Sequence, residues 1–412
     1  MNSTPPSNVA IEPAEAVRTR AAPAVLQVLP SLKTGGGGVE RATIDIAAAL
    51  QASGAPAFVA SSGGHLVNEL ARSGATHITL PLASKNPLVM RANVQRLVNV
   101  IEQHGINIVH ARSRAPAWSA RAAARRTGRH FLTTFHGTYN YGAGRIGVLK
   151  KRYNSVMADG DIVIANSHFI ADHLRSRYHV PEERIRIVPR GIDLGVFNPA
   201  KTTTARVVDL AGRWNLPDDA FVVMLPGRLT RWKGQSLLIE ALGILKSRAG
   251  AEGLNVIGLL VGSDQGRSSY RAELEQRINA LGLTDRVSVL GHCRDMAAAY
   301  MLTDVVVSAS TDPEAFGRVV AEAQAMGRPV VVADHGGAAE QIIAGDTGWL
   351  FTPGDANALA DALGEALSIG AQARAQLAST AVQHVHNRYS KIGMCAATLD
   401  IYAELEQRRA QN

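Results

Sequence analysis

The chain has 412 residues, of which 46% are hydrophobic and 19% are charged, so wholesale disorder is excluded. At about 150 residues per domain, this length predicts two to three domains. No uninterrupted apolar run approaches the roughly 18 residues that a membrane-spanning helix needs. Residues 1–22 are rich in Pro, Ser and Ala without the pattern of a secretory signal, which indicates a disordered leader. Two cysteines, Cys293 and Cys395, are too few for a disulfide framework and favour a cytoplasmic location.

Positive charge is concentrated in the first half of the chain. Residues 1–200 carry 23 Lys and Arg against 12 Asp and Glu, whereas residues 201–412 carry 20 against 23. No acidic residue lies between Glu102 and Asp159. The basic residues of this segment are Arg112, Arg114, Arg121, Arg125, Arg126, Arg129, Arg145, Lys150, Lys151 and Arg152. Such a field favours an anionic partner, and a solvated helix face is the alternative.

Short apolar runs alternate with helical patterns along nearly the whole chain. The first predicted strands are 25–29, 57–61, 77–80, 106–110, 130–135 and 161–166, with an amphipathic helix at about 39–51. After a polar stretch, a second series of predicted strands follows at 221–225, 255–261, 287–290, 304–308, 329–332 and 348–351. This alternation predicts an α/β protein with two doubly wound parallel sheets joined near residue 200. Ligands of such sheets bind beyond the carboxyl ends of the strands.

The first loop of interest is a glycine run at residues 35–38, directly before Val39 and Glu40. Glycines let backbone amides approach a ligand closely, and the helix N-terminus that follows favours an anion. A dinucleotide-binding fingerprint requires glycine where Glu40 stands, and no acidic residue ends the second predicted strand. A nicotinamide-dependent dehydrogenase is therefore disfavoured, and a simple tight turn remains the alternative.

The second loop, residues 226–234, follows a predicted strand and leads into a helix. Arg228 and Lys233 flank its turn. An arginine fork and a compact lysine charge suit a diphosphate, although the P-loop pattern itself is absent. Two solvated surface cations are the alternative.

The third loop leads from the strand predicted at 304–308 into a helix and contains Glu314. Glu322 follows about two helical turns later. The free amides of Phe316, Gly317 and Arg318 begin this helix and can receive phosphate oxygens. Carboxylates on either side of a phosphate site are suited to accept hydrogen bonds from sugar hydroxyls.

In this combination and order, the loops resemble those of the family-4 retaining glycosyltransferases, which have the GT-B fold. The resemblance covers nearly the whole chain beyond the leader. It also includes Phe135-His136-Gly137, Ala165-Asn166-Ser167, residues 188–193, residues 329–337 with Glu340, and residues 346–350. It implies that residues 23–200 form an acceptor-binding domain and residues 201–390 bind a nucleotide-sugar. Residues 391–412 would form a helix that returns to the first domain.

The resemblance also implies roles for individual residues. The expected catalytic set is His136, Glu314, Arg228 and Lys233, with the two cations on the diphosphate and Glu314 on the donor sugar. Glu322 would accept hydrogen bonds from the ribose. Further donor contacts are expected from Gly37, Gly38, Cys293, Arg294, Phe316, Gly317 and Arg318. The residues expected to contact the acceptor are Glu40, His110 and Arg112.

No metal site is expected. Asp159-Gly160-Asp161 matches the D-x-D pattern of metal-dependent glycosyltransferases, but it directly precedes a predicted strand, whereas ligands bind at the other strand end. The resemblance implies metal-independent front-face displacement with retention, a UDP- or GDP-sugar as co-substrate, and no further cofactor.

The positive first half predicts an anionic glycan or glycolipid acceptor, in lipopolysaccharide core or other cell-envelope synthesis, and peripheral association with an anionic membrane. A nucleic-acid-binding protein is a rival hypothesis, but aromatic residues are sparse in the basic segment and no recognised module is present. A non-catalytic member of the family is the nearer alternative.

Overall fold

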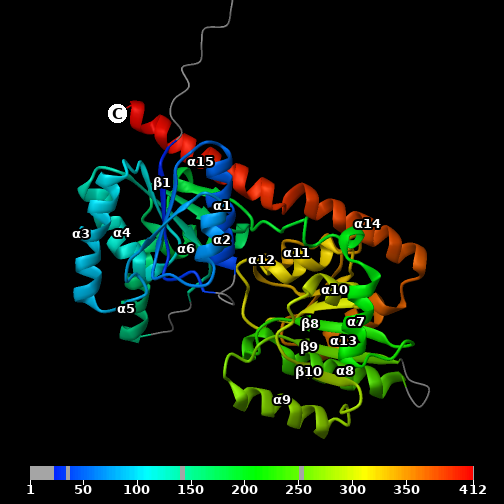
Figure 1. Ribbon diagram of the computed structural model, residues 1–412. Helices are drawn as coiled ribbons and strands as arrows, with labels where there is room; N and C mark the ends of the chain where they lie inside the picture. The colour runs from blue at the N-terminus through cyan, green and yellow to red at the C-terminus, as the bar shows by residue number, and fades with distance from the viewer. Residues whose placement is uncertain (1–22, 34–37, 140–143, 250–254, 412) are drawn as a thin grey trace, which may run out of the picture.

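The computed structural model describes residues 23–33, 38–139, 144–249 and 255–411, which form two α/β domains (Figure 1). The N-terminal sheet is parallel, with the strand order β3-β2-β1-β4-β5-β6-β7. Its strands are β1 (Val25–Val28), β2 (Ala57–Ser61), β3 (Thr76–Thr79), β4 (Ile108–Ala111), β5 (His130–Phe135), β6 (Ile162–Ala165) and β7 (Ile185–Ile187). Strands β1, β4 and β6 are buried along their whole length, and β2 and β5 each have a single half-buried residue, as expected for a sheet covered on both faces.

The C-terminal sheet is also parallel, with the order β10-β9-β8-β11-β12-β13. Its strands are β8 (Phe221–Pro226), β9 (Val256–Val261), β10 (Val287–Leu290), β11 (Val305–Ser308), β12 (Val330–Ala333) and β13 (Trp349–Phe351). Every strand that the sequence predicts is present within one or two residues, and the prediction of an α/β protein with two doubly wound sheets is confirmed. Strand β7 was not predicted, because it is only three residues long and has Arg186 at its centre.

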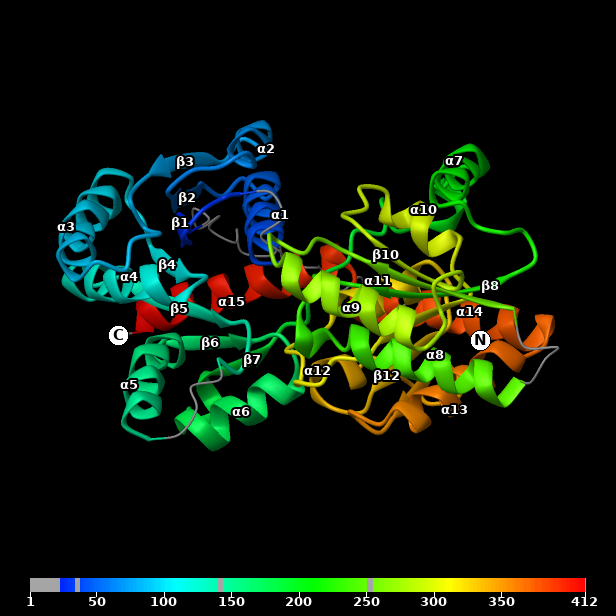
Figure 2. The same ribbon diagram turned by 90° about the horizontal axis from the view of Figure 1, so that it is seen from below.

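Helices cover both faces of each sheet (Figures 1 and 2). In the N-terminal domain they are α1 (Gly38–Ala52), α2 (Val67–Arg72), α3 (Pro87–Gln103), α4 (Arg114–Arg126), α5 (Gly144–Asn154) and α6 (His168–Tyr178). The C-terminal domain contains α7 (Thr204–Trp214), α8 (Gln235–Ala249), α9 (Ser268–Ala280), α10 (Met296–Met301), α11 (Arg318–Ala325), α12 (Gly336–Ala339), α13 (Ala356–Ser368) and α14 (Ala371–Arg388). The last helix is α15 (Lys391–Gln411), and the short 3-10 helices are η1 (Ser155–Ala158), η2 (Glu182–Arg184), η3 (Pro199–Lys201) and η4 (Arg231–Lys233).

The chain passes between the domains twice, and the two crossings lie side by side. Ile192 donates its N–H to the Tyr389 carbonyl at 2.7 Å, and Lys391 donates to the Ile192 carbonyl at 2.9 Å. From there α15 runs back along the N-terminal domain beside α1 (Figure 1). Met394, Tyr402 and Leu405 of α15 join the hydrophobic core of that domain. The last helix therefore belongs to the N-terminal core by packing.

A second contact between the domains lies at the N-terminus of α6. The carboxylate of Glu340, which follows α12, accepts hydrogen bonds from the backbone N–H groups of His168, at 2.9 Å, and Phe169. Within the same turn, the Ser167 side chain accepts from the Ile170 N–H at 3.1 Å. An acidic side chain at a helix N-terminus satisfies free amides and interacts favourably with the helix dipole. A residue of the C-terminal domain thus caps a helix of the N-terminal domain.

Within the described ranges, no helix combines the length and apolar character needed to cross a bilayer.

Candidate active site

A cleft of about 630 Å³ lies between the two domains. Its walls come from the start of α1 and from the loops that follow β5, β6, β7, β8 and β11, all of them beyond the carboxyl ends of the strands. A second hollow, of about 640 Å³, lies between α11 and α14 and is lined by Arg328, which precedes β12. Ligands of α/β sheets bind at the carboxyl ends, so the first cleft is the candidate site.

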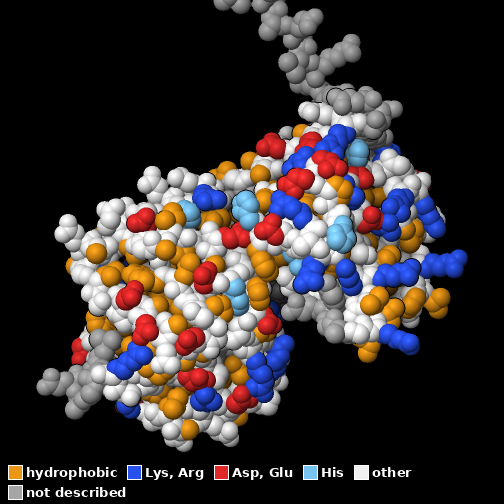
Figure 3. Space-filling view, turned by 180° about the vertical axis from the view of Figure 1, so that it is seen from behind, with side chains coloured by type: hydrophobic (Ala, Val, Ile, Leu, Met, Phe, Trp, Pro, Cys, Tyr) orange, Lys and Arg blue, Asp and Glu red, His pale blue; other side chains and the backbone are white. Residues whose placement is uncertain are grey.

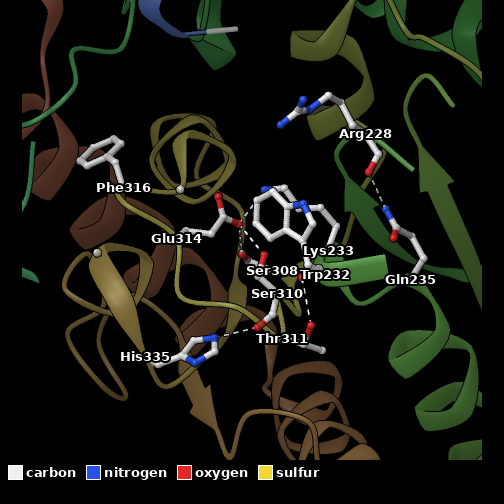
Figure 4. Close-up of polar contacts among 12 residues, drawn as sticks. Arg228, Trp232, Lys233, Gln235, Ser308, Ser310, Thr311, Glu314, Phe316 and His335 are labelled. Carbon is white, nitrogen blue, oxygen red and sulfur yellow. Dashed lines mark hydrogen bonds and ion pairs between the residues drawn. The ribbon is translucent and has the colours of Figure 1, made fainter. Parts of the chain in front are cut away.

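Lys233 and Glu314 form an ion pair on the C-terminal side of this cleft (Figure 4). Lys233 Nζ donates to Glu314 Oε1 at 2.7 Å, and Ser310 Oγ donates to the same oxygen at 2.6 Å. Ser308 Oγ lies 3.5 Å from it. Burial raises the pKa of the Glu314 carboxyl, but the Lys233 charge and these hydrogen bonds outweigh burial and lower it overall. Glu314 is therefore ionised and held in one position.

The loop that carries Lys233 is fixed from both sides. The buried Gln235 side chain donates to the Arg228 carbonyl at 2.9 Å, and the Thr311 N–H donates to the Trp232 carbonyl at 2.7 Å (Figure 4). Gly234 has φ +75°, and a Cβ there would lie 1.9 Å from the Ala309 carbonyl oxygen, so only glycine fits. The loop therefore approaches β11 closely. The exposed Arg228 side chain lines the cleft apart from the ion pair.

The Gly336-Gly337 pair supports the backbone of Glu314. Gly337 donates its N–H to the Glu314 carbonyl at 2.7 Å, and a Cβ on Gly336 would lie 2.9 Å from the Glu314 nitrogen. His335 Nε2 lies 2.7 Å from the Ser310 carbonyl oxygen, which requires its proton on that nitrogen (Figure 4). The segment after β12 thus positions the loop that presents Glu314.

A second ion pair lies on α11. Arg318 Nη2 is 2.8 Å from Glu322 Oε1, and the buried Tyr300 hydroxyl donates to Glu322 Oε2 at 3.0 Å. Burial raises the pKa of Glu322, although Arg318 and the Tyr300 hydrogen bond oppose this effect. The backbone N–H groups of Phe316 and Gly317, just before α11, donate to no group in the described part of the chain. These amides are available to an anion.

Cys293 and Arg294, from which donor contacts are expected, lie outside the lining of the cleft. Cys293 is half-buried and packs in the cluster that contains Tyr300, whereas Arg294 is exposed. Burial raises the pKa of the Cys293 thiol. Tyr300, in the cluster against which Cys293 packs, contacts Glu322.

On the N-terminal side, His136 follows β5 and Arg190 follows β7. Arg190 Nη2 lies 2.9 Å from His136 Nδ1, and Arg190 Nη1 donates to the Gly38 carbonyl at 2.8 Å. The Tyr139 hydroxyl accepts from the His136 backbone N–H at 3.3 Å. Burial, followed by the charges of Arg190 and Arg112, lowers the pKa of His136 well below its usual range. His136 is therefore neutral at physiological pH.

Two of the residues expected to contact the acceptor lie beneath the cleft. His110 is 0% exposed, and its ring nitrogens are each 2.7 Å from a hydroxyl, Tyr402 OH and Thr134 Oγ1. Arg112 is 2% exposed. The burial of these two side chains therefore contradicts the prediction that they contact the acceptor directly. Glu40, on the first turn of α1, is half-buried beside the Arg190 charge, and burial raises the pKa of its carboxyl.

The remaining predictions concern Gly37, Gly38 and the D-x-D pattern. Gly38 lines the cleft, whereas Gly37 lies outside the described residues. Asp159 is ion-paired with Arg121 and lies 3.4 Å from Arg125. Asp161 Oδ2 accepts the Phe131 N–H at 2.9 Å. Both carboxylates thus lie at the amino end of β6, and the described residues contain no cluster of His, Cys, Asp and Glu suited to a metal.

The comparisons with known proteins agree with this architecture. Two family models match, Glycosyltransferase Family 4 over residues 36–196 and Glycosyl transferases group 1 over residues 209–384. The crystal structure of a glycosyltransferase from Rickettsia africae is 35% identical, with a TM-score of 0.84, and the match covers 93% of this chain and 98% of that one. The chain belongs to the family-4 glycosyltransferases of the GT-B fold.

Two further relatives of this glycosyltransferase chain are informative. HepE from Anabaena, solved in complex with UDP-glucose, is 25% identical, with a TM-score of 0.76 over 94% of this chain and 100% of that one. The D-inositol 3-phosphate glycosyltransferase of Xylanimonas cellulosilytica is 35% identical over 258 residues, which is 62% of this chain. The chain spans only 59% and 52% of the length of two such curated relatives.

Several residues of this glycosyltransferase site were not predicted from the sequence. Ser308 and Ser310 are two positions apart at the end of β11, and that period-2 spacing on a strand end was the available signal. Arg190 lies in residues 188–193, which the family resemblance includes, but no role was predicted for it. Gln235 and Tyr300 gave no signal, because their functions depend on contacts between segments distant in sequence.

Proposed function

We propose that this protein transfers a hexosyl unit from a UDP-linked sugar to an anionic glycan or glycolipid acceptor, with retention of configuration. The observation that carries the proposal is the largely buried Lys233–Glu314 pair, held by Ser310, beside the free amides that precede α11. A cation for a diphosphate and a fixed carboxylate for sugar hydroxyls are thereby placed at one wall of the cleft. The complex of HepE with UDP-glucose supports UDP as the nucleotide.

In the proposed reaction, Lys233, Arg228 and the amides of Phe316 and Gly317 bind the diphosphate. The bond between the anomeric carbon and the diphosphate oxygen breaks while the acceptor oxygen bonds to that carbon from the same face. The acceptor proton passes to the departing phosphate oxygen. Negative charge grows on the leaving group, so cations and amides already in place stabilise the transition state more than the ground state.

Two more groups complete the donor site in this proposal. Glu322, oriented by Tyr300 and Arg318, accepts hydrogen bonds from the ribose hydroxyls. His136 is neutral and donates to a hydroxyl of the transferred sugar. The cations that would neutralise the diphosphate come from the chain itself, which supports a reaction without a bound metal.

An anionic acceptor is supported by the charge of the N-terminal wall. Arg190 is 7% exposed, and burial, followed by the charges of Arg112 and Arg318, lowers its pKa to about 9. Cations held close together are stabilised by an anion that binds among them. The related enzymes named for D-inositol 3-phosphate act on a phosphorylated substrate, which supports the same chemistry here. A phosphorylated cell-envelope glycolipid, such as lipopolysaccharide core, fits this requirement.

The surface of α5 supports peripheral membrane association. Ile146, Val148 and Leu149 are 68%, 69% and 68% exposed. The exposed basic residues Arg145, Lys150 and Arg152 lie among them, and Figure 3 shows basic and apolar side chains together at this end of the domain. Apolar side chains that insert and cations that bind anionic headgroups are the combination found in interfacial helices. The helix begins five residues after Tyr139, which lines the cleft.

The donor proposal is tested with UDP, GDP and a panel of UDP- and GDP-hexoses. A bound donor raises the melting temperature by mass action, and slow hydrolysis of the donor reports turnover without a known acceptor. We expect stabilisation and hydrolysis with one UDP-hexose in the wild type and in the exposed control Lys246→Ala. Lys233→Ala should lose both. Equal results in the two variants, or no response to any donor, would remove the assignment.

The membrane proposal is tested by co-sedimentation with anionic and neutral liposomes over a series of NaCl concentrations. Binding should require anionic lipid and weaken steeply with salt, because the Debye length is about 8 Å at physiological ionic strength. The double variant Lys150→Gln/Arg152→Gln should bind less, and so should Ile146→Ser/Leu149→Ser. The control is Arg271→Gln/Arg277→Gln on α9, which makes the same charge change. Salt-insensitive binding to both liposome types, or none to either, contradicts the proposal.

A further inference from the structure

Arg190 joins three segments of the N-terminal domain at the cleft. It follows β7, its Nη1 donates to the Gly38 carbonyl at the start of α1 at 2.8 Å, and its Nη2 lies 2.9 Å from Nδ1 of His136 after β5. The side chain is almost completely buried, which costs free energy that these bonds offset. Both Arg190 and His136 line the cleft.

The contact determines which nitrogen of His136 carries a proton. A guanidinium has donors only, so His136 Nδ1 must be the acceptor and unprotonated. The charged groups facing this ring are Arg190 and Arg112, and with His110 and burial they lower its pKa well below the usual range. The ring is therefore neutral, and its single proton is on Nε2.

His136 Nε2 has no hydrogen-bond partner among the described residues, although it is shielded from solvent. A buried N–H without a partner is unfavourable, because the group has lost its hydrogen bonds to water. The backbone of Arg112 also hydrogen-bonds the ring, but its effect on the His136 pKa is smaller than the effects of burial and of the neighbouring charges. Among the described residues, the Nε2 proton of this cleft residue has no partner of good geometry. An oxygen of a bound sugar would satisfy it.

We propose that Arg190 is a positioning residue that holds His136 in the cleft as a neutral Nε2–H donor toward a substrate hydroxyl. Arginine is suited to this role because its planar fork fixes two acceptors at once, whereas lysine has a single flexible ammonium. One fork arm anchors to the backbone of α1, and the other orients the imidazole. The kinetic part of this proposal rests on the proposed transferase function, but the tautomer itself does not.

The tautomer is tested by ¹⁵N NMR of the full-length protein with labelled histidine, and His136→Gln identifies the signal. We expect one neutral His136 ring with Nδ1 unprotonated from pH 8.5 down to about pH 6. Arg190→Met should give a mixture of tautomers and a higher pKa for His136, because a neighbouring positive charge is removed. Arg190→Lys keeps the positive charge, so the pKa of His136 in this variant should lie between its values in the wild type and in Arg190→Met. A protonated Nδ1 in the wild type, or an unchanged signal in Arg190→Met, overturns the proposal.

The kinetic test is a double-mutant cycle on donor turnover. Arg190→Met should lower kcat by roughly ten- to a hundredfold, with a smaller change in KM, because a misplaced group costs about that much. The acid limb of kcat/KM should move to higher pH. If Arg190 acts through His136, the double variant with His136→Ala should be no slower than His136→Ala alone, within about twofold. Additive losses would show that Arg190 contacts the substrate directly.

The exposed Arg72→Gln is the matched control in the same domain and should behave as the wild type. Loss of folding is detected by the melting temperature of each variant. If no nucleotide-sugar is turned over, the transferase proposal fails while the NMR experiment still decides the role of Arg190. If turnover is normal in Arg190→Met, the positioning role fails and the transferase proposal stands.

Discussion

The two walls of the cleft differ in how they balance charge. On the C-terminal wall, each buried carboxylate has a cation within 2.8 Å, in the pairs Lys233–Glu314 and Arg318–Glu322. On the N-terminal wall, Arg190 donates to a carbonyl and to a neutral imidazole. A diphosphate that enters the first wall competes with Glu314 for Lys233, although Arg228 is exposed there. An anion that meets the second wall finds Arg190, which has no ion-pair partner among the described residues.

This difference explains why one domain can be selective and the other adaptable. A fully paired buried network fixes geometry, since removing either partner leaves an uncompensated charge. The C-terminal wall is thus suited to one constant ligand, a nucleotide diphosphate. The N-terminal wall offers a field with fewer fixed contacts, which suits acceptors that share a negative charge but differ in shape.

The largest expected effect tests the C-terminal wall. Lys233→Ala should reduce kcat by about two orders of magnitude or more, as when a preorganised donor to a transition-state anion is removed. Arg228→Ala should also be slow, with more of its effect in KM, because the side chain is exposed and forms no ion pair within the described residues. Steady-state rates with the preferred donor measure both effects.

The exposed Lys246→Ala on α8 is the control for this experiment. Near-wild-type turnover in both Lys233→Ala and Arg228→Ala would show that neither cation stabilises the leaving group. The contrast between the two walls would then have no catalytic meaning.

The C-terminal wall was easier to predict from sequence than the N-terminal wall. Arg228, Lys233 and Glu314 lie in two loops next to strands with clear apolar patterns, and Glu322 lies on the helix that follows the second loop, so local sequence predicts their location. The ion pair between Lys233 and Glu314 joins residues 81 positions apart, and no local pattern reports it.

On the N-terminal wall, strand position alone was misleading. His110 and Arg112 stand at the end of β4, as ligand-binding residues often do, yet α15 covers them. The partner of His110 is Tyr402, 292 positions later in the chain. Only the path of the last helix determines that this strand end is buried, and the sequence pattern does not encode that path locally.

The next effect concerns this covering helix. Tyr402→Phe should lower the free energy of unfolding by about 1–3 kcal/mol, because His110 Nδ1 loses its partner in a fully buried site. Urea denaturation measures the loss, and Tyr153→Phe on α5, a half-buried tyrosine, is the control. Donor turnover should change little. A stable Tyr402→Phe protein would mean that α15 packs on the first domain without needing this contact.

A pH effect should come from the N-terminal domain. Burial lowers the pKa of both His110 and His136, so the folded protein resists protons that the unfolded chain binds below about pH 6.5. Stability should therefore be constant above that pH and fall below it, by up to about 1.4 kcal/mol per pH unit for each histidine. Urea unfolding between pH 8 and pH 5.5 measures the slope.

The variant His110→Gln should lose part of that slope, whereas His65→Gln at an exposed position serves as the control. A slope that is unchanged in His110→Gln would place the protonation elsewhere in the molecule.

A smaller effect tests the contact between the domains away from the cleft. Glu340→Ala removes the cap of α6 and should cost about 1 kcal/mol. Glu340→Gln keeps an acceptor oxygen but loses the charge that favours the helix N-terminus, so it should cost less. Hydrogen exchange of the His168 and Phe169 amides should quicken in both variants and most in Glu340→Ala. Unchanged exchange would show that the domains do not depend on this cap.

The smallest expected effect is the response to metal removal. If the C-terminal wall neutralises the diphosphate with its own cations, donor turnover should survive dialysis against EDTA and gain nothing from added Mn²⁺. Asp159→Asn should leave turnover within about twofold, because Asp159 is ion-paired with Arg121 at the amino end of β6, opposite the cleft. Asp159 and Arg121 are only half-buried, and ion pairs near the surface contribute about 0–1 kcal/mol to stability, so the fold should be retained. A strict Mn²⁺ requirement, with activity restored by titration and lost in Asp159→Asn, would show that Lys233 and Arg228 do not suffice. The C-terminal wall would then need a bound metal ion, in addition to its own cations, to neutralise the diphosphate.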